Sequence, residues 1–191
     1  MVNVAFIVEG NSEKIIVESD GFRSFLRSLG YELISPVVDA QGGGNLLPNN
    51  IEVFLDRLRG QDPEHIFILT DLEDEPSVDE VRSRVGNDDI SFSFVAIKAL
   101  EAWYLADTDA IRSWLKCDVF YEEQPEKTVY KPWDRLKEIA MERGKPGPGS
   151  KVTFAKKIIK KHGFDIKNAA AHEHCESAKE LVEYFEERST T

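Results

Sequence analysis

The sequence predicts an α/β fold: a compact, Rossmann-like core with a mostly parallel four-stranded sheet flanked by helices, followed by a helical C-terminal extension. Short apolar runs alternate with helical patterns up to residue 97, and only helical patterns follow. Parallel strands need long crossovers between them, and helices supply these, so the alternation indicates a parallel sheet. We expect residues 1–106 to form the core and residues 107–191 to pack on it as part of a single globular unit.

Four segments have the character of strands. Residues 2–8, 66–70 and 92–97 are short apolar runs rich in β-branched or aromatic side chains, as in strands that are buried on both faces. Residues 33–38 form a weaker candidate, because Pro36 cannot donate a hydrogen bond to a neighbouring strand. We therefore expect this strand at an edge of the sheet.

Amphipathic helical patterns join the strands and continue beyond them. Between the strands they cover residues 13–29, 50–58 and 77–85. A glycine follows each of these patterns within two residues, as is common just beyond a helix end. Five further patterns cover residues 100–105, 108–115, 133–143, 150–162 and 176–188. The C-terminal part is thus predicted to be helical.

The composition is that of an ordinary globular protein. The chain is 41% hydrophobic and 31% charged, and no apolar run approaches the roughly 20 residues that a membrane span needs. The N-terminus lacks the basic flank, apolar core and cleavage site of a signal peptide. Cys117 and Cys175 form no C-x-x-C pair, which favours reduced thiols. We therefore expect a cytoplasmic protein without a membrane partner.

The net charge of −11 conceals a strong polarity along the chain. Residues 1–126 carry 10 basic and 25 acidic side chains, residues 127–161 carry 11 and 3, and residues 162–191 carry 3 and 7. The basic excess in the middle segment can attract a polyanion, so we expect nucleic acid, DNA or RNA, as a partner. A solvated helix face is the alternative interpretation. The candidate nucleic-acid contacts are Lys151, Lys156, Lys157, Lys160 and Lys161.

Acidic residues follow the predicted strands directly. Glu9 ends the first strand and Glu13 comes four residues later, while Asp71 and Glu73 follow the third strand. Ligands bind beyond the carboxyl ends of parallel strands, and these acids meet there if the first and third strands are neighbours. Two carboxylates about 4 Å apart repel each other by roughly 4 kcal/mol at an effective dielectric constant near 20, which a proton, a lysine or a divalent cation can offset. Helix capping explains any one of these acids, whereas an oxygen ligand set for Mg²⁺ or Mn²⁺ explains them together.

These residues resemble the Toprim domain, which topoisomerases, primases, recombination-repair proteins and the overcoming-lysogenization-defect (OLD) nucleases share. The stretch VEGNSE at residues 8–13 is similar to the Glu-Gly-x-Thr-Glu motif of the OLD type, and DLE at residues 71–73 is similar to the Asp-x-Asp motif after the third strand of the family. Ser12 stands in place of threonine, and Glu73 stands in place of the second aspartate. Residues 99–107 and 175–178 look like segments of small uncharacterised bacterial Toprim-like proteins of about this length.

The resemblance implies a divalent-metal-dependent nuclease, or a related phosphotransfer enzyme, that uses one or two Mg²⁺ or Mn²⁺ ions. It implies that Glu9 is a metal ligand and a proton acceptor, that Lys98 stabilises charge on the phosphate, and that Glu101 orients Lys98 or binds metal. The implied metal ligands are Glu9, Glu13, Asp71 and Glu73, with Asp74 as the alternative to Glu73.

Two other functions are compatible with the same residues. A Toprim-like module without competent metal geometry would bind nucleic acid, a protein partner or a second copy of the chain and would not cleave. A receiver-like module would instead accept a phosphoryl group on Asp71, near Lys98. The receiver interpretation is the weaker one, because no Thr or Ser ends the fourth strand.

Overall fold

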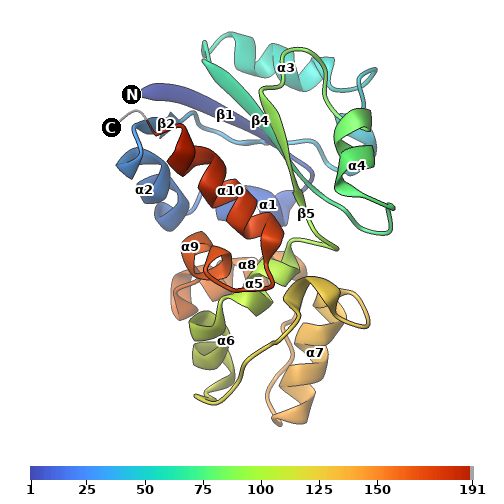
Figure 1. Cartoon of the computed structure of the whole chain (residues 1–191), viewed down its shortest axis with the longest axis vertical. Helices are drawn as coiled ribbons and strands as arrows, with labels where there is room; N and C mark the ends of the chain where they lie inside the picture. The colour runs from blue at the N-terminus through green and yellow to red at the C-terminus, as the bar shows by residue number, and fades with distance from the viewer. Residues whose placement is uncertain (190–191) are drawn as a thin grey trace.

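A parallel sheet forms the centre of the N-terminal half of the chain in the computed structural model, which describes residues 1–189 (Figure 1). Its strands are β1 Val2–Val8, β2 Tyr31–Leu33, β3 Val38–Asp39, β4 His65–Asp71 and β5 Phe92–Ala96. The order across the sheet is β2-β1-β4-β5, β3 also pairs with β1, and all the pairs are parallel. The predicted α/β class with a mostly parallel sheet flanked by helices is therefore confirmed.

The sheet has five strands and not four, because the strand predicted at residues 33–38 is divided. β2 pairs with the start of β1, where Val4 lies opposite Leu33, and β3 pairs with its end, where Ile7 lies opposite Val38. Pro36 lies between the two short strands, where its missing N–H removes no ladder hydrogen bond. The predicted edge position of this segment is correct.

The helices differ from the predicted ones mainly in their boundaries. The pattern at residues 13–29 forms two helices, because Ser19 accepts a hydrogen bond from the Phe22 N–H and so starts a second helix. A short helix at Ile166–Ala170 was not predicted. The helices are α1 Asn11–Val17, α2 Asp20–Ser28, α3 Glu52–Arg59, α4 Val78–Arg84, α5 Glu101–Ala106, α6 Thr108–Leu115, α7 Pro132–Glu142, α8 Lys151–His162, α9 Ile166–Ala170 and α10 Glu176–Glu187, with 3₁₀ turns at Gly43–Leu46 and Pro125–Lys127.

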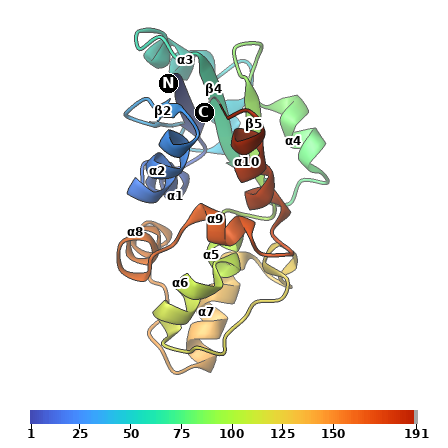
Figure 2. The same ribbon diagram turned by 60° about the vertical axis from the view of Figure 1, so that its left-hand side comes forward.

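The two faces of the sheet bury different hydrophobic clusters. On one face Val4, Phe6 and Val8 pack with α1, α2 and α10, and on the other Ala5 and Ile7 pack with α3. Alternate residues of β1 therefore serve both clusters, which explains why the strand is apolar throughout. Helices α5–α9 gather at one end of the molecule, beyond the sheet (Figure 2).

The C-terminal helix α10 returns to the sheet and completes the α/β layer. It crosses in front of the sheet in Figure 1, and the Phe185 ring lies 5.2 Å from Phe67 and 5.8 Å from Phe94, centroid to centroid. One hydrophobic cluster contains residues of the sheet together with residues of α5–α10. The segment that we expected to be an extension thus shares its core with residues 1–106.

A buried hydrogen-bond network holds the start of α10 against the end of β5. The Ser177 hydroxyl accepts hydrogen bonds from Trp103 Nε1 (2.8 Å) and from the Ile97 N–H (3.2 Å), and donates one to Glu126 Oε1 (2.5 Å). The Glu126 carboxylate also accepts from the N–H groups of Glu176 and Ser177. This network fixes the chain that leaves β5 for the site described below.

Ser177→Ala is expected to lower the free energy of unfolding by about 2 kcal/mol, because it leaves the buried Trp103 N–H without its acceptor and removes a donor from the buried Glu126 carboxylate. Urea unfolding followed by circular dichroism measures the change. Ser24→Ala, at an exposed position of α2, is the matched control and should change stability by less than about 0.5 kcal/mol. Equal effects of the two substitutions would contradict the role of the network.

Candidate metal and phosphate site

Four carboxylates gather at the carboxyl end of the sheet, and we call Glu9, Glu13, Asp71 and Glu101 the acid cluster. Glu9 directly follows β1 and Asp71 ends β4, and these strands are hydrogen-bonded neighbours with Val8 opposite Leu69. Glu13 lies in the first turn of α1, and Glu101 begins α5. The Glu13 and Glu101 side chains are only 7% and 2% exposed, whereas Glu9 and Asp71 are half-buried.

Backbone and hydroxyl donors fix two of these carboxylates. Glu9 Oε2 accepts a hydrogen bond from the Thr70 hydroxyl (2.5 Å) and one from the Asp71 N–H (3.0 Å). Asp71 Oδ1 accepts from the N–H of Leu100, just before α5 (2.8 Å). Among the described residues, the hydrogen bonds to Glu9 all reach Oε2 and those to Asp71 all reach Oδ1. The other oxygen of each carboxylate is left for a ligand.

The four carboxylates act on one another electrostatically. Burial raises the pKa of Glu13 to about 7, and the charges of Glu9 and Glu101 contribute to this rise. Burial likewise raises the pKa of Asp71 well above its usual range, with further contributions from Glu13, Glu101 and Glu9. Burial and mutual repulsion both make the ionised form of these carboxylates less favourable. A bound cation would offset their negative charge and so favour the ionised form.

Lys151 supplies a positive charge to the cluster. Its Nζ lies 2.9 Å from Glu101 Oε1. Burial alone would lower the pKa of Lys151, but the charges of Glu101, Asp71 and Glu13 outweigh burial and raise it. The ammonium group is therefore held in its charged form by three members of the acid cluster.

Two buried oxygens of α5 have no hydrogen-bond partner among residues 1–189: Glu101 Oε2 and the Tyr104 hydroxyl. Burial raises the pKa of Tyr104 well above its usual range, and the charges of Glu101, Glu13 and Asp71 contribute to this rise. Buried polar atoms are normally paired, and unpaired ones indicate an absent cation, water or ligand. The residues present thus fit a cation bound by oxygen atoms.

The cluster is not a preformed metal cage. Among residues 1–189, no three His, Cys, Asp or Glu side chains are arranged to hold one ion as they stand. Hydrogen bonds to Glu9 and Asp71, and the ion pair of Glu101, occupy one oxygen of each carboxylate. Binding a divalent ion would therefore need side-chain movement, above all at Glu101 and Lys151.

A cavity of about 260 Å³ opens onto the cluster from the other side of Glu9. Glu9, Asp71 and Glu73 line it together with Gly43 and Gly44. A Cβ atom on Gly43 would lie 3.2 Å from Glu9 Oε1, so glycine at this position lets the loop pass close to the carboxylate. The cavity leaves Glu9 and Asp71 accessible from this side.

Glu73 lines this cavity but is not part of the acid cluster. It is exposed, and its backbone has a positive φ of 50°. Its N–H donates to the Lys98 carbonyl (2.8 Å), and the largest contributions to the raised pKa values of Glu13 and Asp71 come from burial and from other groups. The predicted metal ligands Glu9, Glu13 and Asp71 therefore lie together, whereas Glu73 lies at the edge of the site.

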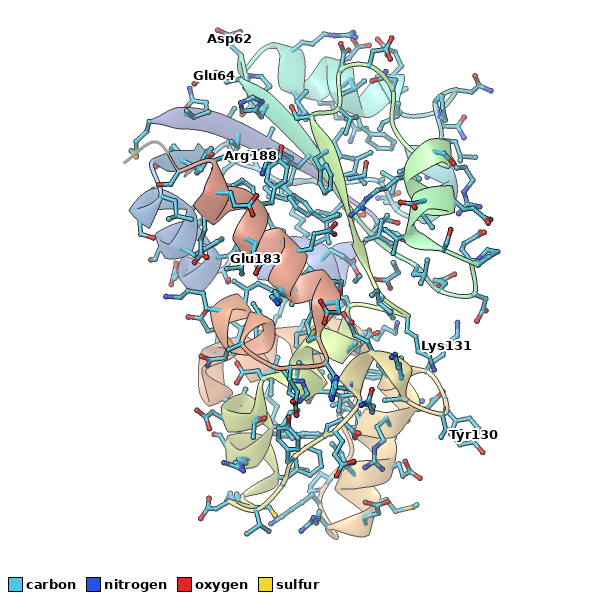
Figure 3. All side chains as sticks on the ribbon, viewed as in Figure 1. Asp62, Glu64, Tyr130, Lys131, Glu183 and Arg188 are labelled. Carbon is cyan, nitrogen blue, oxygen red and sulfur yellow. The ribbon has the colours of Figure 1, made fainter. Side chains whose placement is uncertain are left out.

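Lys98 lies outside the cluster as well, which corrects its expected place. Its Nζ contacts the carbonyl oxygens of Thr128 and Tyr130, in a loop whose residues Tyr130 and Lys131 project from the side of the molecule (Figure 3). Lys98 has a positive φ of 63°, in the turn that follows β5. Glu101 pairs with Lys151 and not with Lys98.

Helix α8 places the other predicted lysines beside the site. It packs against α1 and α6 through a buried side that includes Phe154 and Ile158. Lys151 begins the helix and is ion-paired with Glu101 of the acid cluster, and its contact with nucleic acid stays a prediction. The remaining predicted contacts lie on the outer side, where Lys157 is half-buried and the others are exposed: Lys156, Lys160 and Lys161.

Comparisons of the chain with protein-family models, with curated proteins and with solved structures gave no match. None of the helices formed by residues 1–189 has the length and apolar character that crossing a bilayer requires.

Proposed function

We propose that this chain is a divalent-metal-dependent phosphodiesterase that acts on DNA or RNA at the acid cluster. One observation carries the proposal: four carboxylates and the single lysine ion-paired with them meet at the carboxyl end of a parallel sheet, beside a basic helix. Ligands of parallel sheets bind at this end. Unpaired negative charge buried at this end destabilises the folded state, and a bound cation would offset that destabilisation.

The residues divide into two groups by what they would do. Glu9, Glu13, Asp71 and Glu101 would hold Mg²⁺ or Mn²⁺, as one ion or two, with Glu73 available at the edge of the cavity. Bound metal supplies neutralisation of the phosphate and acidification of water. Glu9 borders both the cluster and the cavity, so its second oxygen is placed to accept a proton.

Helix α8 supports nucleic acid as the substrate. Its outer lysines recur at a spacing of four residues, as in Lys156 and Lys160, and therefore lie along one side of the helix. Such a row can follow a phosphate backbone, and its binding should weaken steeply as the salt concentration rises. Lys151, and not Lys98, is the ammonium group close enough to the cluster to approach a scissile phosphate.

The test is cleavage of labelled single- and double-stranded DNA and RNA by the purified chain in Mn²⁺, in Mg²⁺ and in chelator. We expect cleavage of at least one substrate with a divalent ion and none in chelator. Cleavage that persists in chelator would contradict the metal-dependent mechanism. Failure to cleave any of these substrates in either ion would contradict the phosphodiesterase.

A non-catalytic binding module is the second candidate, and the position of Glu73 favours it. An exposed Glu73 outside the cluster leaves the site without the second close acid of the Asp-x-Asp pattern. In that case the chain would bind nucleic acid through α8 in a salt-dependent manner but leave it intact. The receiver-like alternative receives less support, because Lys98 points away from Asp71.

A further inference from the structure

We propose that Lys151 is an internal competitor for the divalent cation, and that metal binding releases its ammonium group from Glu101. This inference rests on the proposed function, since it assumes that the acid cluster binds metal. It adds a form of regulation: the same lysine closes the metal-free site and becomes available to a phosphate group when metal binds.

The ion pair is built so that the lysine can leave and the carboxylate cannot. The Lys151 side chain is 50% exposed, whereas that of Glu101 is 2% exposed. The ammonium thus reaches the buried carboxylate from the surface, and rotation of its flexible stem returns it to solvent. Glu101 has no such route and needs a new cation when Lys151 departs.

The oxygens beside the ammonium are those that a metal ion would need. Glu101 Oε1 is paired with Lys151, and Glu101 Oε2 and the Tyr104 hydroxyl are buried without partners. The charges of Glu13 and Asp71 also favour the charged form of Lys151. A divalent ion and an ammonium group repel each other and cannot both occupy the position beside Glu101 Oε1.

The release of Lys151 would also affect α8, the basic helix that it begins. Lys151 is the first residue of α8, directly after the Ser150 cap, and an irregular segment rich in proline and glycine, residues 145–149, precedes it. Because coupling between two ligands is reciprocal, metal that frees Lys151 should strengthen nucleic-acid binding, and nucleic acid should strengthen metal binding.

The first test uses the unaltered protein and needs no activity. Brief treatment with acetic anhydride, followed by mass spectrometry, reports how exposed and unpaired each lysine amine is. Mn²⁺ is expected to raise acetylation of Lys151 at least about fivefold, the lower end of typical coupling between sites. Lys156, on the outer side of α8, is the internal control and should not change. Acetylation of Lys151 that is unchanged or reduced by Mn²⁺ would overturn the proposal.

The second test compares Mn²⁺ affinity by calorimetry without nucleic acid. Lys151→Met removes the ammonium but keeps a long side chain, and should bind Mn²⁺ at least about fivefold more tightly than the unaltered protein. Lys156→Met removes the same charge from the same helix and should change the affinity less than twofold. Equal or weaker binding by Lys151→Met would refute the competition.

The two tests separate this inference from the proposed function. If Mn²⁺ binds and releases Lys151 but no nucleic acid is cleaved, the phosphodiesterase is wrong and the competition stands. If cleavage depends on metal but Lys151 responds in neither test, the competition is wrong and the phosphodiesterase stands. If Mn²⁺ binds neither protein, both fail.

Discussion

Glu9→Gln is expected to reduce metal-dependent cleavage by roughly 10²- to 10³-fold, the usual loss when one electrostatic group is removed from a charged transition state. The glutamine carbonyl can still accept the hydrogen bonds from the Thr70 hydroxyl and the Asp71 N–H, so the local fold should be kept. What is lost is the negative charge. Initial rates on the best substrate, measured at saturating Mn²⁺, give the size of the effect.

A second readout distinguishes loss of a ligand from loss of the fold. The Glu9 charge contributes to the raised pKa of both Glu13 and Asp71, so Glu9→Gln should lower these pKa values and leave stability equal or higher. Asp71→Asn should reduce cleavage to a similar extent. Asp74→Asn, an exposed acid three residues further on, is the matched control and should retain the activity. Comparable losses for Asp74→Asn and Asp71→Asn would contradict a site at the acid cluster.

The position of Glu9 and Asp71 could be predicted because each apolar run stops at an acid. In a strand that is buried on both faces, the first charged residue marks the end of the strand, and all ends of a parallel sheet point the same way. That prediction required β1 and β4 to be adjacent in the sheet, which the sequence does not reveal, since strand order is decided by packing between distant segments. In the structure the two strands are adjacent, with Val8 paired with Leu69.

The lysine of the site could not be predicted in the same way. Lys98 stands three residues before Glu101, so local spacing favoured it. Lysine is not a residue that signals the left-handed conformation, yet Lys98 adopts it and points to the loop at Thr128. Lys151 lies far along the chain and reaches Glu101 only because α8 packs against α1. Tertiary contact, which no local pattern encodes, decides between the two.

The position of α10 in the fold also depends on tertiary contacts that no local sequence pattern encodes. Its amphipathic pattern predicts a helix, but the pattern does not say which surface that helix covers. The aromatic residues of β1, β4 and β5 on one face leave an apolar surface that α1 and α2 share with α10, through Phe185. A helix from the end of the chain therefore belongs to the layer that the first hundred residues begin.

The metal-free protein is expected to lose stability as the pH rises from about 4.5 to about 7. The pKa of Glu13 is about 7 in the folded protein against an ordinary value of 4.5, so within this interval the folded state binds more protons than the unfolded state. The free energy of unfolding then falls with rising pH, by about 3 kcal/mol from Glu13 alone. Asp71, whose pKa is also raised, changes stability in the same direction. Urea unfolding in chelator at pH 5, 6, 7 and 8 measures the slope.

Glu13→Gln should remove the part of this slope that Glu13 contributes, because the amide has no proton to lose, and should leave the part due to Asp71. Glu183→Gln, an exposed position on α10, should leave the slope unchanged (Figure 3). Mg²⁺ or Mn²⁺ should restore the lost stability at pH 8 but have little effect at pH 5, since protons and metal ions compete for the same carboxylates. A slope of the opposite sign, or one that Glu13→Gln does not alter, would show that the buried charge of the acid cluster does not limit the stability of the metal-free fold. The expected sign means that the metal-free fold is less stable near neutral pH than at pH 5, because the carboxylates of the acid cluster are then ionised and no cation offsets their charge.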